Sequence, residues 1–151
     1  MKRVIVLMTV LCLLLSVFPF GAYAESEDDE LVEYLPDGGY IVTEIFDIDT
    51  RAAQSATKSF AKTKYDENGN LDWKITLTAT FTYDGVTARC TATDLDVTIY
   101  DSSWYQISAY HNRGGANGYA NVQLGRKHLG VTVEKPTYYL SLNCTPDGNI
   151  S

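Results

Sequence analysis

The side chains that could carry out chemistry are few in this sequence, and two of them form a pair of carboxylates. Asp94 and Asp96 are separated by one residue, so in an extended strand both point to the same side. Paired carboxylates are the catalytic groups of most glycoside hydrolases. Acids at alternate positions are also common on solvated strand faces. A small secreted hydrolase that uses these surface carboxylates is therefore an alternative function, not the leading one.

The other polar candidates do not complete a catalytic or metal-binding set. His111 and His128 are the only histidines, and without further ligands nearby they do not predict a zinc site. Ser102 and Ser103 lie in a turn-like segment that lacks the G-x-S-x-G pattern of a nucleophile elbow. The oxygen-rich segment 66–70 lacks the terminal acidic ligand of a calcium loop. The sequence therefore predicts no catalytic residue, no metal site and no cofactor.

Aromatic rings close to amide side chains give a candidate binding surface. In the segment 104–110 the apolar parity consists of Tyr105, Ile107 and Ala109, which are predicted to face the core. Flat rings beside amides suit sugars, whose C–H faces stack and whose hydroxyl groups need polar partners. The candidate ligand-binding residues are those predicted to face outward on two strands: Trp104, Gln106, Tyr110, Tyr119, Asn121 and Gln123. Alternatively, Trp104 caps the core at the start of its strand.

The elements that position these residues are strands. Alternation of apolar and polar residues with period two, typical of half-buried strands, recurs from Tyr40 to Cys144, and helical periodicity is almost absent. The predicted strands span residues 40–48, 58–65, 72–83 with a hairpin partner from residue 86, 95–100, 104–110, 118–124 and 129–144, the last interrupted near Pro136. The fold predicted is all-β: a single small antiparallel β-sandwich of about seven strands.

Two cysteines are predicted to point into the core. A two-residue turn at residues 84–85 sets a register in which Ala79 faces Cys90, and Cys144 shares the parity of Leu142. Two inward cysteines on distant strands of an exported chain predict one structural disulfide. Closing a loop of about 54 residues stabilises the fold by about 4 kcal/mol. The alternative is a thiol nucleophile, which requires an unpaired surface cysteine near a base.

The N-terminal residues predict export. Lys2 and Arg3 precede an apolar run that ends in small residues, so residues 1–24 are interpreted as a signal peptide cleaved after Ala24. Contact with a membrane is predicted only through this transient segment, and the mature protein is predicted to be extracellular.

The negative charge is concentrated in the segment that follows. From Glu25 to Asp49 there are ten acidic and no basic residues, whereas residues 50–151 carry nine acidic and ten basic ones. Residues 25–39 are therefore predicted to be an acidic flexible leader, and residues 40–151 the β-sandwich domain. Nucleic acid is excluded as a partner because no basic surface neutralises its phosphates.

Four segments of the chain carry a family resemblance. They are "LPDGGYIVTEI" after the acidic leader, "LTATFTYDGVTARCTAT", "GRKHLGVTV" and the closing "LSLNCTPDGNIS". Together they cover most of the mature chain and resemble a group of small secreted proteins of Gram-positive bacteria with no characterised function. The resemblance implies a bacterial origin, export and the pairing of Cys90 with Cys144, and it implies no catalytic residues.

These features favour a secreted, non-catalytic domain that contacts an extracellular partner, such as a glycan of the cell wall or cell surface. The aromatic residues outside the predicted core carry this hypothesis. A purely structural role at the cell surface is a further alternative.

Overall fold

The computed structural model describes residues 30–48 and 54–151, which form strands and turns. The all-β prediction is confirmed for this part of the chain. The predicted signal peptide, its cleavage after Ala24 and the first residues of the leader lie outside the described residues. Within the described residues, no helix is long and apolar enough to cross a membrane.

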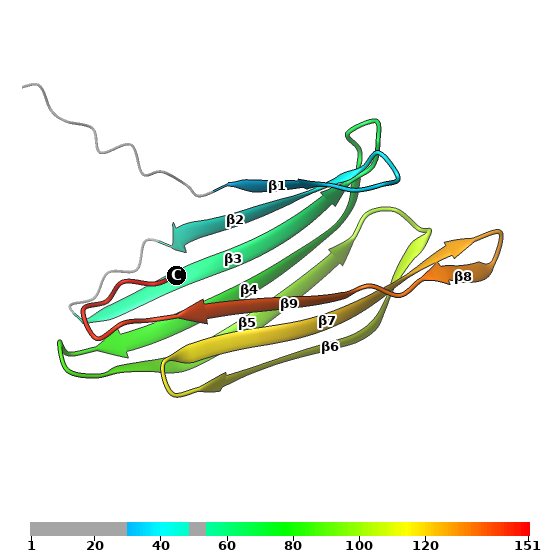
Figure 1. The fold of residues 1–151 in the computed structure, drawn as a ribbon. Coiled ribbons are helices and arrows are strands. Elements are labelled where there is room, and N and C mark those ends of the chain that lie inside the picture. Colours follow the sequence, from blue (N-terminus) through cyan, green and yellow to red (C-terminus); the bar gives the residue numbers. More distant parts are fainter. Residues whose placement is uncertain (1–29, 49–53) are drawn as a thin grey trace, which may run out of the picture.

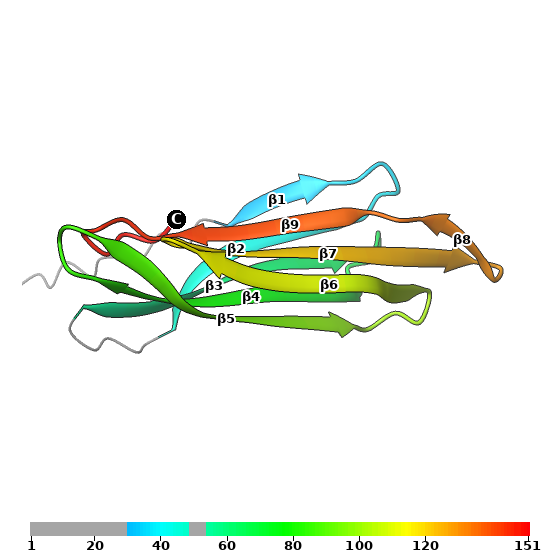
Figure 2. The same ribbon diagram turned by 90° about the horizontal axis from the view of Figure 1, so that it is seen from below.

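The strands form two antiparallel sheets (Figure 1). The first sheet is a meander in the order β1-β2-β3-β4-β5, and the second has the order β6-β7-β8, with β9 also paired to β7. Figure 2 shows strands of both sheets running along the length of an elongated molecule. The strands are β1 Leu31–Tyr34, β2 Tyr40–Ile48, β3 Ser55–Tyr65, β4 Leu71–Tyr83, β5 Ala88–Ile99, β6 Trp104–Gly114, β7 Asn117–His128, β8 Val131–Glu134 and β9 Thr137–Asn143.

The two sheets share a hydrophobic core in a sandwich-like arrangement. Alternation places every second residue of β4 and β7 inside, and these buried residues pack against one another. The larger cluster contains Ile41, Trp73, Ile75, Leu77, Trp104, Ala120, Val122, Leu124 and Leu140. A second cluster nearer the β4–β5 turn contains Ala79, Phe81, Cys90, Leu142 and Cys144. The predicted inward faces of β4, β7 and β9 are thus confirmed.

The sheets approach each other closely at a glycine. A Cβ atom on Gly118 of β7 would lie 2.9 Å from Ala79 Cβ and 2.9 Å from Thr93 Cγ2, both in the first sheet. Such contacts are shorter than packed carbon atoms allow. Small residues on β4 and β7 therefore set the spacing between the sheets at this end of the core.

Part of the predicted flexible leader is a strand. Residues 31–34 form β1 and pair with β2 from Leu31↔Thr43 to Tyr34↔Tyr40, so the predicted flexible segment does not extend to residue 39. The break predicted near Pro136 is confirmed, because β8 ends at Glu134 and β9 begins at Thr137. The β5 strand is continuous where the sequence suggested two strands.

The predicted register of the β4–β5 hairpin is wrong, although Cys90 does point inward. Asp84 accepts hydrogen bonds from the backbone N–H groups of Val86 (2.9 Å) and Thr87 (2.7 Å), which lengthens the turn beyond two residues. The longer turn pairs Tyr83 with Ala88, so that Phe81, not Ala79, lies opposite Cys90, and a bulge beyond this pair then places Thr80 opposite Ala92.

We predict that Gly118→Ala destabilises the fold by about 1–3 kcal/mol, because the added methyl group must force the sheets apart. Gly114→Ala on the same hairpin is the matched control, since its Cβ atom would meet nothing within 4 Å. Urea denaturation of the two variants measures the difference. Equal midpoints for both variants would contradict the close approach.

Candidate functional site

Trp104 belongs to the core and not to a ligand platform. Its side chain is 3% exposed, and its Nε1–H donates a hydrogen bond to Asp72 Oδ2 at 3.1 Å. Its ring meets that of Trp73 edge-on, with centroids 6.1 Å apart. The prediction that Trp104 binds ligand is therefore wrong, and the alternative, that it caps the core, is confirmed.

The reason is a reversed alternation at the start of β6. Because Trp104 faces inward, Tyr105 faces outward, the reverse of the prediction. A bulge between Gln106 and Ser108 then inserts one extra residue, so that from Ser108 onward the residues of β6 face the sides that the sequence suggested. Gln106 lies opposite the buried Leu124, so it is on the inward-facing side of β6. Gln106 is thus separated from the other predicted ligand-binding residues, and its assignment to that face is wrong. Ile107 and Ala109, predicted to be core, are exposed.

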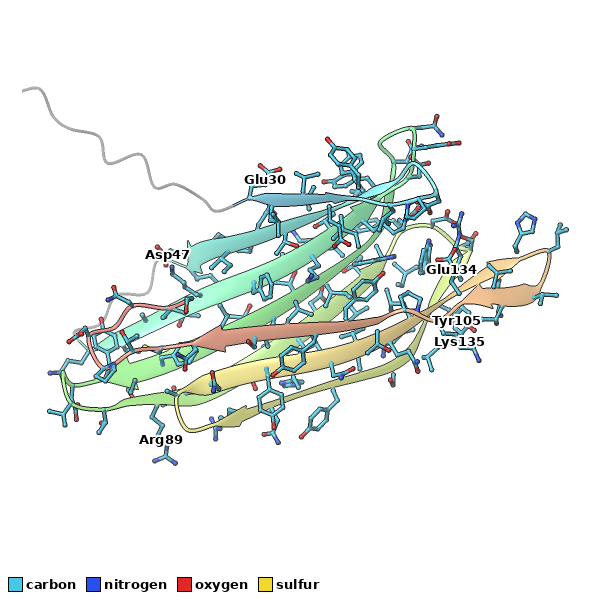
Figure 3. The ribbon with its side chains drawn as sticks, viewed as in Figure 1. Glu30, Asp47, Arg89, Tyr105, Glu134 and Lys135 are labelled. Carbon is cyan, nitrogen blue, oxygen red and sulfur yellow. The ribbon has the colours of Figure 1, made fainter. Side chains whose placement is uncertain are left out.

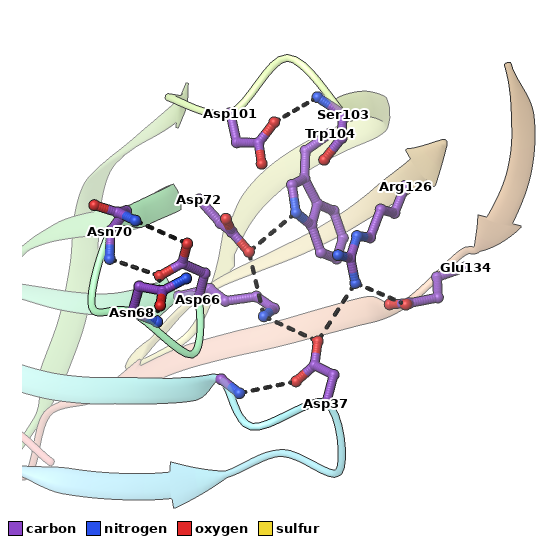
Figure 4. A network of polar contacts seen from close by, with 12 residues as sticks. Asp37, Asp66, Asn68, Asn70, Asp72, Asp101, Ser103, Trp104, Arg126 and Glu134 are labelled. Carbon is purple, nitrogen blue, oxygen red and sulfur yellow. Dashed lines mark hydrogen bonds and ion pairs between the residues drawn. The ribbon is translucent and has the colours of Figure 1, made fainter. Parts of the chain in front are cut away.

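A buried ion pair fixes Trp104 in this orientation (Figure 4). The Nζ atom of Lys64 on β3 lies 3.2 Å from Asp72 Oδ2 on β4, and the two residues are only 2% and 4% exposed. Lys64 Nζ also lies 5.8 Å from the centroid of the Trp104 ring. One carboxylate therefore holds both a lysine of the first sheet and the indole N–H of the second.

The charged network continues to the surface through Asp37. Its Oδ2 atom lies 3.4 Å from Lys64 Nζ and 3.4 Å from the NH1 nitrogen of Arg126, which in turn lies 3.3 Å from Glu134 Oε1. Partial burial on its own would raise the pKa of Asp37. The hydrogen bond from the Gly39 N–H and the positive charge of Lys64 outweigh it and lower that pKa. Asp37 thus stays ionised and links the β1–β2 turn to β7.

Two cavities adjoin this network. A polar one of about 200 Å³ is bordered by Asp66, Glu67, Asp101 and others, and a more apolar one of about 330 Å³ by Leu35, Tyr138 and others. Asp37 and Lys64 border both. Lys64 is already paired with two carboxylates and is almost inaccessible, so it is not available as a free base or anion ligand. The network holds the two sheets together at this end of the molecule.

The outward-facing residues of the second sheet form the candidate functional site. The pairing of β6, β7 and β9 brings nine side chains into three cross-strand rows on one face. The rows are Asn112, Tyr119 and Ser141; Tyr110, Asn121 and Tyr139; and Ser108, Gln123 and Thr137. We call this set the tyrosine face. It contains no charged side chain.

The sequence placed four residues of the tyrosine face together correctly: Tyr110, Tyr119, Asn121 and Gln123. It missed Tyr139 and Asn112 as site residues. Tyr139 is 60% exposed, and the alternation of residues 137–143 could have placed it on the outer face of its strand. What the sequence lacked was the pairing of β9 with β7 rather than with another strand.

The rings of the tyrosine face are close enough to act together. The centroids of Tyr110 and Tyr119 are 6.5 Å apart at an angle of 53°, and Asn112 Nδ2 donates a hydrogen bond to Tyr110 Oη at 2.7 Å. Desolvation, and then the neighbouring Tyr110, raises the pKa of Tyr119. The phenol of Tyr119 therefore stays protonated and remains a hydrogen-bond donor. The face offers stacking surfaces, donors and acceptors, and no group for acid–base catalysis at neutral pH.

The predicted alternatives for catalysis lie outside the tyrosine face. Asp94 and Asp96 are exposed on β5, where Asp96 Oδ2 accepts a hydrogen bond from Thr98. His111 contacts Thr93 through Nδ1 at 3.0 Å. Across residues 30–48 and 54–151, no three His, Cys, Asp or Glu side chains are grouped so that they could hold a metal ion.

The predicted disulfide is not present in the structure. Cys90 and Cys144 are free thiols, both buried in the smaller core cluster. Each Sγ atom lies within hydrogen-bonding distance of a nearby backbone carbonyl oxygen, that of Ala92 at 3.4 Å and that of Thr145 at 3.3 Å. Burial raises the pKa of both thiols, so neither is an activated nucleophile.

Comparison of the chain with protein-family models, with curated proteins and with solved structures gives no match.

We predict that Asp72→Ala destabilises the fold by about 3 kcal/mol, because it leaves the buried Lys64 ammonium and the Trp104 N–H without their shared acceptor. Adding Lys64→Met to this variant restores much of the loss, since no buried charge is then left. Asp96→Ala, which removes an exposed carboxylate, is the control. Guanidinium denaturation measures all three, and an Asp72→Ala midpoint equal to that of Asp96→Ala would refute the structural role of the ion pair.

Proposed function

We propose that the protein is an exported, non-catalytic binding domain whose tyrosine face binds a neutral polysaccharide outside the cell. The observation that carries this proposal is the block of nine uncharged polar and aromatic side chains on one exposed sheet face. Export is supported by the signal-like residues 1–24 of the sequence.

The chemistry of the tyrosine face favours a sugar over other ligands. Tyrosine rings stack on the C–H faces of sugar rings, and their hydroxyl groups bond to sugar hydroxyls. The side-chain amides of Asn112, Asn121 and Gln123 each offer both donors and an acceptor. The absence of charged side chains from the nine positions gives no preference for an anionic or cationic ligand. Neutral, polyhydroxylated chains are the class that fits all three properties.

The size and shape of the face fit an extended chain. Three strands about 4.8 Å apart and three rows about 7 Å apart give an area of about 10 by 14 Å, enough for two or three sugar rings. Tyr110 and Tyr139 are 54% and 60% exposed, so their rings are accessible without a conformational change. A flat and open surface of this kind supports binding along a polymer.

The proposal also includes a disulfide between Cys90 and Cys144, which forms once the chain is exported. The backbone N–H groups of Cys90 and Cys144 bond to the carbonyl oxygens of Gly115 and Ala116, which are neighbours in one turn. Both side chains are in the same buried cluster. In an oxidising compartment the two thiols would lose two protons and two electrons to the disulfide of an oxidoreductase, forming one S–S bond while that disulfide is reduced to two thiols.

We predict that the intact exported chain is about 2 Da lighter than the same chain after reduction, as one disulfide requires. Reduction is expected to lower stability by about 4 kcal/mol, the value for a loop of this length. Intact-mass spectrometry with alkylation under denaturing conditions measures the oxidation state. Alkylation of both cysteines without prior reduction would exclude the disulfide, and would leave glycan binding untouched.

We predict that Tyr119→Ala weakens binding to soluble fragments of neutral cell-wall polysaccharide by roughly fivefold, which corresponds to the loss of about 1 kcal/mol of stacking. Tyr110→Ala and Tyr139→Ala should act similarly. Tyr100→Ala is the matched control, because Tyr100 is 55% exposed but lies outside the tyrosine face. Isothermal titration calorimetry is the appropriate readout, since Trp73 and Trp104 are buried and their emission would respond little. Equal affinities for Tyr100→Ala and Tyr119→Ala would contradict the proposal.

A further inference from the structure

The β7–β8 hairpin ends in an unusual turn. His128 pairs with Val131, so Leu129 and Gly130 form a two-residue connection, and their φ angles are 50° and 80°. A turn of this kind requires positive φ at both positions, which Gly, Asn and Asp adopt readily. A leucine there is strained because its Cβ atom approaches the backbone.

No contact among residues 30–48 and 54–151 buries the Leu129 side chain in compensation for this strain. The side chain of Leu129 is 91% exposed, so it gains no burial from its position. Strained residues that do not stabilise the fold are often found at functional sites. Its neighbours Val131 and Val133 are 66% and 54% exposed, and with Leu129 they form what we call the apolar tip.

The hairpin carries the apolar tip away from the body of the molecule. In Figure 1 the β7–β8 hairpin projects beyond the rest of the second sheet, at the end opposite the C-terminus. Tyr105, Glu134 and Lys135 lie at its base (Figure 3). The tip is therefore convex and accessible.

Positive charge lies at the base of the apolar tip. Residues 126–135 contain three cationic side chains and one carboxylate, in a chain whose net charge is −7. Arg126 is paired with Glu134. Lys127 lies over the ring of Tyr105, with its Nζ atom 4.8 Å from the centroid, and makes no ion pair, and Lys135 makes none within the described residues either. Both ammonium groups are exposed and available to an anionic surface.

We propose that the β7–β8 hairpin is a peripheral anchor that inserts Leu129 into the surface of an anionic lipid bilayer. Leucine and valine enter the boundary of the acyl chains favourably, and lysines beside them reach the lipid phosphates. A protein partner fits less well, because Leu and Val are rare among the hot-spot residues of protein interfaces, where Trp, Tyr and Arg are enriched. Hot-spot residues also lie in well-packed pockets. This site is separate from the tyrosine face and does not depend on glycan binding.

Acidic residues limit the depth of the contact. Asp66 and Glu67 lie in the β3–β4 turn at the same end of the molecule, and their charge opposes a close approach of the whole end to an anionic membrane. Contact is thus restricted to the projecting hairpin. Binding is expected to be weak, reversible and reduced by salt.

Vesicle co-sedimentation tests the anchor with a chain from Glu25 to Ser151, which keeps every described strand. We expect binding to vesicles of phosphatidylglycerol mixed with phosphatidylcholine at low salt, and none to pure phosphatidylcholine. Leu129→Asn is the informative variant, because Asn tolerates positive φ. It should raise the melting temperature by about a few degrees while reducing vesicle binding on the order of tenfold. Lys127→Gln combined with Lys135→Gln should reduce both the binding and its dependence on salt.

Leu31→Asn is the matched control, because Leu31 is 67% exposed but lies on β1; it should bind vesicles as the parent does. No binding to anionic vesicles at low salt would overturn the proposal. So would a Leu129→Asn variant that binds as well as the parent.

Discussion

The contact of Asp72 with both Lys64 and Trp104 is the interaction on which the rest of the structure depends. One buried carboxylate accepts a hydrogen bond from the indole of β6 and pairs with a lysine of β3, so it ties the second sheet to the first. Because a buried charge is tolerated only when it is paired and hydrogen-bonded, the three groups must assemble together. Trp104 is then committed to the core, and the alternation of β6 begins from an inward residue.

The positions of the functional surfaces follow from the inward orientation of Trp104. A bulge corrects the parity of β6 after Gln106, so that Tyr110 joins Tyr119 and Asn121 on the outer face. Gly125 lacks the side chain that would collide with the Tyr105 ring, which can therefore lie flat over β7 and meet Lys127. The tyrosine face and the base of the β7–β8 hairpin are thus consecutive parts of one sheet surface. A domain anchored by the hairpin would present its tyrosine face along its side.

The sequence predicts the parts of this fold that regular alternation determines. Residues 119–124 and 138–144 alternate without interruption, and the buried positions of β7 and β9 agree with the prediction. The failures lie at the longer β4–β5 turn, which moves the register by two residues, and at the bulges near Phe81 and Gln106, where one extra residue reverses the face of every residue on one side of it. The sequence alone does not reveal a bulge, because a bulge is an irregularity in the pairing with another strand. Likewise β1 directly follows a run of acidic residues and is exposed along its whole length, and only the pairing with β2 reveals it as a strand.

We propose that ligand binds the tyrosine face while Trp104 remains part of the core. The most direct test is a ¹⁵N NMR titration of the chain from Glu25 to Ser151 with a soluble neutral wall polysaccharide. Binding at the tyrosine face is expected to shift the amide signals of β6, β7 and β9 around Tyr110, Tyr119 and Tyr139, while the indole N–H signal of Trp104 stays in place. Shifts centred on the Trp104 indole and the cavities beside Asp37, with the signals of the tyrosine face unchanged, would contradict it.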